Sequence, residues 1–423
     1  MSKRTSPRRR ANWPYRFAWL SILGGVLVYV LIQTLIGANT FANLPYGIQW
    51  GNAFVSALLD ATIVTWFVAV GACIGSFLNV VAYRLPLGRG VGGHSSCPYC
   101  CVAIERSDNV PVLGWLKIRG RCRVCRLPIS IQYLLVELTV ALIFGALYLS
   151  EFLIGGGNLP GVDGLPIGVG GMARISVSSV LVARLAVYAL VLSGLVAAAL
   201  IAARRLKVPL SLYLWCLLPI AVTTVALPSS QIVRWREVLP KGVDMRLDAL
   251  ATVLCGCVAG IAMARLLAPL LFPGFDRSLM SSDRETSGAR QFVGAMAVAG
   301  ALLGWQAVIP FTFVLLLCAI IAVGCLRRFA DVAWMADLTV WVWLGLLVFR
   351  AFWKPIYSLH VYLPDFAAPV VIYTLGALAT APLAVAFSRY SRALTPEPVQ
   401  EPEQDEDDDE VGEDGFEAEE ADS

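Results

Sequence analysis

The chain has 423 residues, of which 58% are hydrophobic and only 15% charged, and its mean hydropathy is +0.71. A soluble protein of this length carries about 25% charged residues, so the composition excludes that class and indicates an all-α polytopic membrane protein. The formal net charge of +3 hides an asymmetry. Of the 30 acidic residues, 15 lie between Glu397 and Asp422, with no Lys or Arg among them.

The first predicted elements are a basic arm, residues 1–16, and a long apolar run. The run lacks a small-residue cleavage site, so we expect a retained first helix rather than a signal peptide. Further runs long enough to cross a bilayer recur, and in hydrocarbon such runs must be helical. About ten membrane helices are predicted, near 17–38, 54–83, 134–154, 177–203, 208–227, 248–272, 292–308, 311–326, 335–352 and 366–388.

Pro310 is predicted to mark the turn between the seventh and eighth of these helices, the alternative being one long kinked helix. The loops alternate between basic and nearly uncharged, which predicts orientation. The basic arm and the loop 84–132, with eight Lys or Arg, are expected in the cytoplasm, and so is the C-terminus. The loop 228–247 does not fit this pattern, because it is basic and yet the predicted topology puts it on the outer side of the membrane.

The most specific motif lies in the loop 84–132, where CPYC (97–100) and CRVC (122–125) are separated by 21 residues. Two C-x2-C turns direct four thiolates to one centre, which is typical of a closed, structural zinc site. The alternatives are disulfides or four free thiols, and a reducing cytoplasm argues against disulfides. The predicted zinc ligands are Cys97, Cys100, Cys122 and Cys125.

Other candidate ligands are weaker. Cys101 directly follows Cys100 and is an alternative to it, whereas His94 is expected to be a surface or outer-sphere residue. The remaining cysteines fall in or at the ends of helices and are interpreted as small buried hydrophobic residues. They are Cys73, Cys216, Cys255, Cys257, Cys318 and Cys325.

Helix-packing roles are predicted for several residues around this loop. Gly71 and Gly75 form a small-x-x-x-small face that favours close helix packing, and Ser76 and Asn79 are suited to hydrogen-bond neighbouring helices. Glu137 is expected just inside a helix start, where it would interact with the helix dipole and with a loop arginine.

The stretch from about 71 to 144 resembles the N-terminal half of the prepilin peptidases. The resemblance rests on GSFLNVVAYRLP (75–86), the four cysteines and PISIQYLLVELTVALIF (128–144). It implies a bacterial inner-membrane protein of a family that cuts leaders from type IV prepilins and type II secretion pseudopilins and often N-methylates the new terminus. S-adenosylmethionine as a cofactor is implied by this resemblance alone.

The second half departs from the family pattern. Family members use two membrane-embedded aspartates that share a proton. When residues 200–214 are aligned with the family pattern on Pro209, Ala202 falls at the position of the first aspartate. Leu210 falls at the position of the acid that follows the proline. Counting back from Trp305 places Phe292 at the second, and no Gly-x-Gly-Asp occurs in the chain.

Four other membrane-proximal carboxylates are candidates for a rebuilt pair: Asp60, Asp248, Asp331 and Asp337. We interpret them as interfacial residues. Asp331 and Asp337 would point about 120° apart on one helix, and Asp60 and Asp248 lie near predicted outer ends.

Two hypotheses follow. The first is a non-peptidase family member that acts as a binding or scaffold component in pilus or type II secretion assembly. The second is an active prepilin peptidase or N-methyltransferase whose acids lie elsewhere. The expected partners are the lipid bilayer and, by resemblance, prepilins or pseudopilins, with no nucleic acid.

The predicted domains are the arm 1–16, a prepilin-peptidase-like region 17–154, a C-terminal transmembrane region 155–390 and an acidic tail 391–423. A block of like charge with few apolar residues repels itself, so the tail is expected to be disordered and solvated.

Overall fold

The computed structural model describes residues 13–41, 50–162, 178–232, 244–272, 284–326, 337–358 and 370–392. Within these ranges the chain consists of helices and short helical turns, and the only β structure is two isolated bridges. The predicted all-α class is therefore confirmed. The basic arm up to residue 12 and the tail from residue 393 lie outside the described residues.

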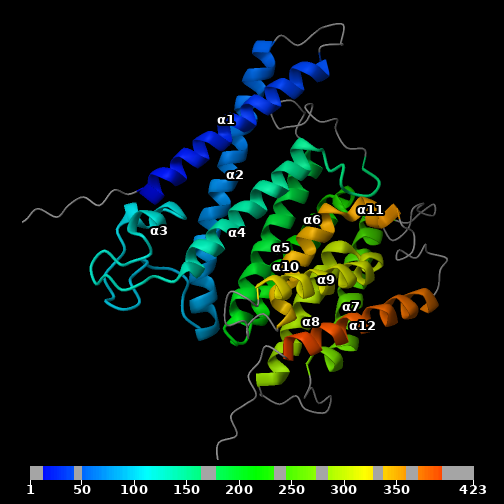
Figure 1. Cartoon of the computed structure of the whole chain (residues 1–423). Coiled ribbons are helices and arrows are strands. Elements are labelled where there is room, and N and C mark those ends of the chain that lie inside the picture. Colours follow the sequence, from blue (N-terminus) through cyan, green and yellow to red (C-terminus); the bar gives the residue numbers. More distant parts are fainter. Residues whose placement is uncertain are drawn as a thin grey trace, which may run out of the picture.

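Each of the ten predicted membrane segments overlaps a helix (Figure 1). These helices are α1 (Trp13–Phe41), α2 (Trp50–Arg84), α4 (Ile131–Tyr148), α5 (Ser179–Ala203), α6 (Leu210–Ala226), α7 (Met245–Leu271), α8 (Arg284–Leu303), α9 (Val308–Leu326), α10 (Val342–Ala351) and α12 (Val370–Arg392). Two short helices, α3 (Leu113–Ile118) and α11 (Trp353–Ser358), complete the set.

By length and composition, six helices of the described part of the chain are suited to cross a membrane. They are the spans Trp13–Asn39, Gly51–Leu87, Ile131–Leu153, Ser179–Ala203, Met245–Leu271 and Trp305–Leu326. Three shorter apolar helices accompany them, Leu210–Ala226, Gly288–Leu303 and Leu338–Ala351. The chain is therefore a polytopic membrane protein.

The turn between α8 and α9 is not where the sequence predicted it. The chain turns at Gly304, which has φ 85° and ψ 158°, and a 3-10 turn Trp305–Ala307 then leads into α9. Pro310 lies within the first turn of α9, where its missing N–H is not needed and its fixed φ suits the helix. The prediction of a turn at Pro310 is wrong because glycine, not proline, adopts a positive φ without strain.

Close packing of α2 on α4 confirms the glycine face that the sequence predicted. A Cβ added to Gly71 would lie 2.8 Å from the Val140 carbonyl oxygen, and one added to Gly75 would lie 2.7 Å from the Glu137 Cα. Asn79 donates to the Tyr133 carbonyl across the same interface, at 3.4 Å. With 35 residues, α2 is about 52 Å long, well beyond the roughly 30 Å of hydrocarbon. Its last turns therefore hold the cysteine loop beside α4.

The C-terminal half is a bundle whose closest contact joins α7 and α8. A Cβ on Gly256 would lie 2.1 Å from the Gly300 carbonyl oxygen, and one on Gly260 would lie 2.1 Å from the Met296 carbonyl oxygen. Because lipid tails are as apolar as side chains, such helices associate through close backbone approach rather than through the hydrophobic effect. A continuous apolar core runs from α2 and α4 through α5 into this bundle.

Candidate functional site

The loop after α2 contains two nearly identical turns, one at each C-x2-C motif. In the first, the Cys97 amide donates to the Val102 carbonyl and the Cys101 amide to the Cys97 carbonyl. In the second, the Cys122 amide donates to Leu127 and the Arg126 amide to Cys122. An isolated β-bridge closes each turn, Ser96 with Ala103 and Arg121 with Pro128. The two turns thus have the same hydrogen-bonding pattern, at a constant offset in the sequence, and we call them the two knuckles.

The four predicted cysteines meet at one point. The sulfurs of Cys97 and Cys125 are 3.8 Å apart, those of Cys100 and Cys122 are 3.9 Å apart, and all four lie within 4.8 Å of one another. A tetrahedron of 2.3 Å zinc–sulfur bonds has edges of about 3.8 Å. The donor set and its spacing fit a closed structural zinc site with all four positions filled by protein.

Backbone amides at the knuckles favour thiolates. The N–H groups of Cys125 and Val124 lower the pKa of the Cys122 thiol to about 6, and those of Cys100 and Tyr99 lower the pKa of Cys97. The Leu127 amide acts in the same direction on Cys125, but burial and the other three sulfurs raise its pKa to about 12. Four thiolates at this spacing therefore need a cation to offset their mutual repulsion.

Cys101 is not part of the cluster. It has φ 57° and occupies the position in the first knuckle that Arg126, with φ 63°, occupies in the second. Its side chain is exposed and lies outside the four-sulfur group. His94 is exposed and also lies outside this group, as predicted.

The helix cysteines are less uniform than predicted. Cys216 is buried, Cys255, Cys257 and Cys318 are half-buried, and Cys73 and Cys325 are exposed. The prediction of burial is therefore wrong for Cys73 and Cys325. Both belong to helices suited to cross the bilayer, where outward-facing positions contact lipid and an apolar thiol costs little.

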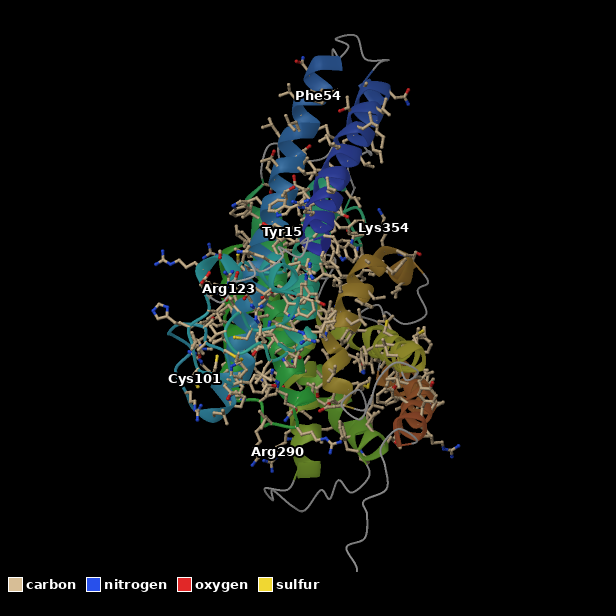
Figure 2. All side chains as sticks on the ribbon, turned by 60° about the vertical axis from the view of Figure 1, so that its left-hand side comes forward. Tyr15, Phe54, Cys101, Arg123, Arg290 and Lys354 are labelled. Atoms are coloured by element: carbon tan, nitrogen blue, oxygen red, sulfur yellow. The ribbon has the colours of Figure 1, made fainter. Side chains whose placement is uncertain are left out.

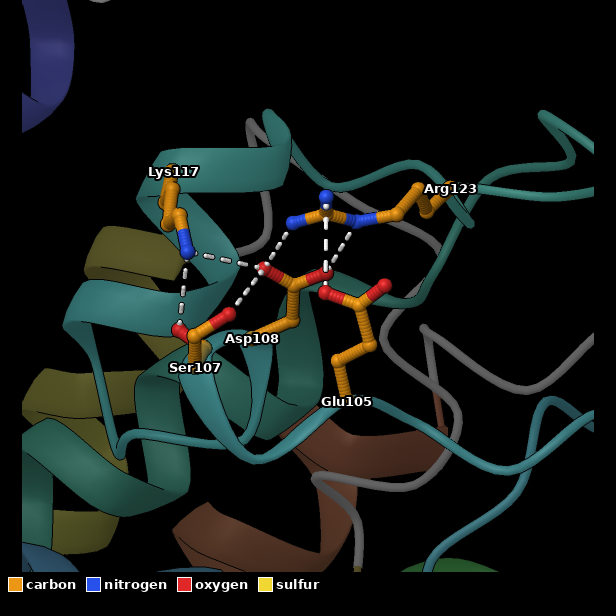
Figure 3. A network of polar contacts seen from close by, with 5 residues as sticks. All are labelled: Glu105, Ser107, Asp108, Lys117 and Arg123. Atoms are coloured by element: carbon orange, nitrogen blue, oxygen red, sulfur yellow. Dashed lines mark hydrogen bonds and ion pairs between the residues drawn. The ribbon is translucent and has the colours of Figure 1, made fainter.

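A polar network joins the second knuckle to the segment between the two knuckles (Figure 3). The carboxylate of Asp108 accepts two hydrogen bonds of 2.6 Å from the Arg123 guanidinium, and the Lys117 ammonium lies 3.1 Å away. Glu105 lies 3.4 Å from the other side of Arg123. Burial raises the pKa of Asp108, but the Arg123 and Lys117 contacts outweigh it and hold the pKa below its usual range. These contacts place Arg123, and with it the second knuckle, against the spacer.

The loop is also tied to α4 through Glu137. Glu137 is buried two turns inside α4, whose N-cap is Ser130, and its carboxylate accepts a 2.6 Å hydrogen bond from the Val112 amide. Ser76 of α2 also reaches this carboxylate. The predicted position at the helix start and the predicted arginine partner are therefore wrong. A backbone donor satisfies the buried acid, because the loop folds back onto the helix.

Val112 itself has a strained backbone, with φ 61° and ψ −57°, and the Leu113 amide donates to the Pro111 carbonyl at 2.6 Å. This is the rare γ-turn of positive φ, which a β-branched residue adopts only when its surroundings demand it. The hydrogen bond from the Val112 amide to the Glu137 carboxylate stabilises this backbone conformation.

Comparison with known proteins agrees with this geometry. The family model described as "Bacterial Peptidase A24 N-terminal domain" matches residues 69–151, which include both knuckles, Gly71, Gly75 and Glu137. This part of the chain therefore matches the N-terminal domain of the prepilin peptidases. The match covers the second half of α2, the cysteine loop and α4, and it confirms the predicted family resemblance of the N-terminal half.

Three curated relatives carry the name prepilin leader peptidase/N-methyltransferase. The chain is 49% identical to the one from Myxococcus xanthus, over 18% of this chain and 23% of the relative. It is 38% identical to the one from Pectobacterium carotovorum, over 21% and 46%, and 36% identical to one from Burkholderia pseudomallei, over 26% and 40%. The chain thus spans less than half the length of these relatives. No solved structure matches it.

The two positions expected for the aspartates of prepilin peptidases are buried in apolar surroundings. Ala202, near the end of α5, is 3% exposed, and Phe292 in α8 is fully buried with its ring 6.2 Å from that of Phe272. Leu210 begins α6 and is exposed. None of the three side chains is able to donate or accept a proton.

The four alternative carboxylates do not converge in the described part of the chain. Asp60 is buried in α2 and accepts a 3.5 Å hydrogen bond from Tyr148, and Asp248 is buried in the first turn of α7. Asp337 caps the turn before α10 by accepting from the Thr339 amide at 2.9 Å, close to Gly288 of α8. Asp331 lies outside the described residues.

The sequence reasoning missed a buried ion cluster. Glu151, which follows α4, lies against the guanidinium groups of Arg350 in α10 and Arg184 in α5, the latter at 3.5 Å. The Arg350 guanidinium also stacks 4.0 Å above the Tyr188 ring. A charged residue inside each of three apolar runs was the available signal, because such residues are costly in a membrane unless they are paired.

Proposed function

We propose that this chain is a prepilin peptidase family member that lacks aspartic peptidase activity. In this proposal it serves as a binding or scaffold component of pilus or type II secretion assembly in the bacterial inner membrane. The observation that carries the proposal is the apolar burial of Ala202 and Phe292, the positions expected for the two acids. An aspartic dyad needs two carboxylates that share a proton and hold a water between them.

The surroundings of Asp337 support the same reading. This carboxylate lies near the start of α8, close to the position of Phe292 along that helix. Its carboxylate accepts a hydrogen bond from the Thr339 amide at 2.9 Å, and no second carboxylate is found in contact with it among the described residues. One acid alone does not form the proton-sharing pair.

Retention of the zinc loop supports a binding role. The four sulfurs, the Asp108 network and the Glu137 contact are all in place, so the part shared with the prepilin peptidases is structurally complete. Zinc would act here as a structural staple for a loop too small to have its own apolar core.

The second candidate is an active peptidase or N-methyltransferase, in which S-adenosylmethionine would be the methyl donor. It is favoured by the names of the curated relatives, which include both activities.

The decisive experiment expresses the chain in a host without its own prepilin peptidase and follows the size of a co-expressed prepilin, with the Myxococcus xanthus relative as the positive control. We expect the prepilin to keep its leader with this chain and to lose it with the relative. Mass spectrometry of an already cleaved prepilin tests N-methylation in the same cells. Efficient leader removal, abolished by substituting any two of Asp60, Asp248, Asp331 and Asp337, would instead establish a rebuilt dyad.

The binding role requires that a full-length prepilin or pseudopilin co-purifies with the chain. We expect co-purification to fall in Cys122→Ser, which breaks the zinc site, and to be kept in Cys101→Ser, which removes the neighbouring exposed thiol. Equal recovery with both variants would show that the zinc loop takes no part in binding.

We further propose that both termini and the zinc loop face the cytoplasm, with Pro45 outside. An impermeant thiol reagent applied to the periplasmic side should label Pro45→Cys above the background of the parent chain, and should not label Gly90→Cys or Gly415→Cys. Labelling at position 90 from that side would reverse the orientation.

A further inference from the structure

A groove of about 450 Å³ opens on the surface of the C-terminal bundle between α6, α7 and α8. Its walls are apolar side chains of all three helices, among them Leu214, Leu217, Ile261 and Val293. Two cations, Lys207 and Arg290, also line it, and no carboxylate is among its lining residues. The groove therefore combines an apolar slot with a positive rim.

Both cations lie at one end of the bundle. Lys207 is in the short connection between α5 and α6, and Arg290 is in the first half of α8. Figure 2 shows Arg290 toward the same end of the molecule as Cys101 of the zinc loop, with Phe54 at the opposite end. Lys207 and Arg290 are exposed. The positive rim thus faces the side on which the zinc loop lies.

Hydrogen bonds hold together the two backbone segments that carry Lys207 and Arg290. The Gln291 side-chain amide donates to the Leu206 carbonyl at 2.8 Å, and the Tyr213 hydroxyl donates to the Gln291 carbonyl at 2.9 Å. The Tyr213 ring lies so close to Gly294 that a Cβ there would be 2.5 Å from it. The connection carrying Lys207 is therefore held against the helix carrying Arg290, and the groove is built into the fold.

The volume of the groove, about 450 Å³, limits the kind of ligand that it is able to hold. A helix 10 Å across and 15 Å long occupies about 1,200 Å³, so the groove is too small to admit a transmembrane helix of a protein partner. A slot of several hundred cubic ångströms suits a ligand with one or a few extended chains. Basic pockets between membrane helices near the cytoplasmic surface attract anionic lipid headgroups.

We propose that this groove binds an anionic phospholipid of the adjacent leaflet, with acyl chain against α6, α7 and α8 and headgroup phosphate between Lys207 and Arg290. The proposal is independent of whether the chain cleaves or binds prepilins. Phe292 does not line this groove, because its side chain is fully buried with its ring 6.2 Å from that of Phe272. A neutral zwitterionic lipid would fill the slot but would gain less from the two cations.

The test uses the purified full chain and native mass spectrometry with phosphatidylglycerol or phosphatidylcholine of identical acyl chains. We expect retention of phosphatidylglycerol to fall about thirtyfold in Lys207→Gln/Arg290→Gln, since each cation near the surface contributes about a factor of five. The control is Arg205→Gln/Arg265→Gln, which removes two exposed cations that are not among the lining residues of the groove. Equal losses in both double variants, or equal retention of the two lipids by the parent chain, would overturn the proposal.

A second variant tests the slot rather than the charge. Ala297 lines the groove, and Ala297→Leu should reduce phosphatidylglycerol retention while the cations stay in place. Melting temperature in detergent confirms that each variant is folded. Soluble glycerophosphoglycerol should neither bind nor raise the melting temperature, because it lacks the acyl chain. If Ala297→Leu leaves lipid retention unchanged but abolishes prepilin co-purification, the groove is a partner-docking surface and the lipid assignment is wrong.

Discussion

The zinc-loop region and the C-terminal bundle are stabilised in different ways. The first combines four converging thiols, a buried carboxylate with two cationic partners and a hydrogen bond from a strained turn to α4. The second depends on glycine-mediated backbone contact between α7 and α8 and on an ion cluster that joins it to the end of α4. The first region contains the match to a family model, at residues 69–151.

This contrast agrees with the proposed function. Polar groups at defined spacing meet in the cysteine loop, whereas Ala202 and Phe292, the two positions at which the resemblance predicts aspartates, are apolar and packed. A helical framework of this kind does not need acids at these positions, because close helix packing does not depend on them.

The largest effect is expected for the zinc site. Purified protein should contain about one zinc per chain, and Cys122→Ser should contain almost none, because a tetrahedral site that loses a thiolate loses most of its affinity. Metal analysis of matched preparations measures this, with Cys101→Ser as the control that keeps the metal. Equal zinc in the parent chain and Cys122→Ser would contradict the assignment.

A smaller but substantial effect is expected for the buried ion cluster. Glu151→Gln leaves the Arg350 and Arg184 guanidinium groups without their carboxylate, and losing one partner of a buried pair costs about 3–5 kcal/mol. We expect a marked fall in melting temperature in detergent. The control is Lys354→Gln, an exposed cation near the same end.

The ion cluster also makes a prediction about coupling. Glu151→Gln/Arg350→Gln should cost less than the sum of its two single variants, because the second substitution removes a charge that the first left unpaired. Strict additivity would mean that the two side chains do not interact in the membrane.

Adding a single methyl group at the contact between α7 and α8 should destabilise the C-terminal bundle. In Gly300→Ala the new Cβ meets the Gly256 carbonyl oxygen, so α7 and α8 must separate, at a cost of about 1–3 kcal/mol. Gly25→Ala in α1 is the matched control, since nothing lies within 4 Å of its Cβ and alanine favours a helix. A melting temperature that falls equally in both variants would argue against close α7–α8 packing.

The smallest effect is expected for Asp108→Asn, which weakens the contacts to Arg123 and Lys117. Because the pKa of Asp108 is lowered in the folded loop, its carboxylate contributes stability above the ordinary pKa, about 4, and loses it as the pH falls through the folded value. The difference in melting temperature between the parent chain and Asp108→Asn should therefore be present at neutral pH and shrink in acid. A difference that grows in acid would contradict this sign.

Much of the zinc loop could be predicted from the sequence because its chemistry is local. Two C-x2-C motifs in one short polar loop predict the four ligands, and Gly71 and Gly75 predict the α2–α4 contact, since helical spacing alone puts both on one face. The position of Cys101 needed the structure, because only the equivalence with Arg126 at positive φ explains why its thiol turns away.

Contacts that join distant segments were less predictable. The Val112 amide on Glu137 and the cluster of Glu151, Arg184 and Arg350 both depend on which segments become neighbours. Periodicity and loop charge do not encode that choice.

The sequence by itself determined the class of protein, the ten helical segments, the four sulfurs and the apolar side chains at positions 202 and 292. These follow from composition, spacing and side-chain chemistry, which are properties of the chain before it folds. The tertiary structure alone decided which backbone donor satisfies Glu137, which cations meet Glu151 and where Lys207 and Arg290 border a groove. Buried polar groups must find partners wherever packing brings them, and that outcome depends on the whole set of helix contacts at once.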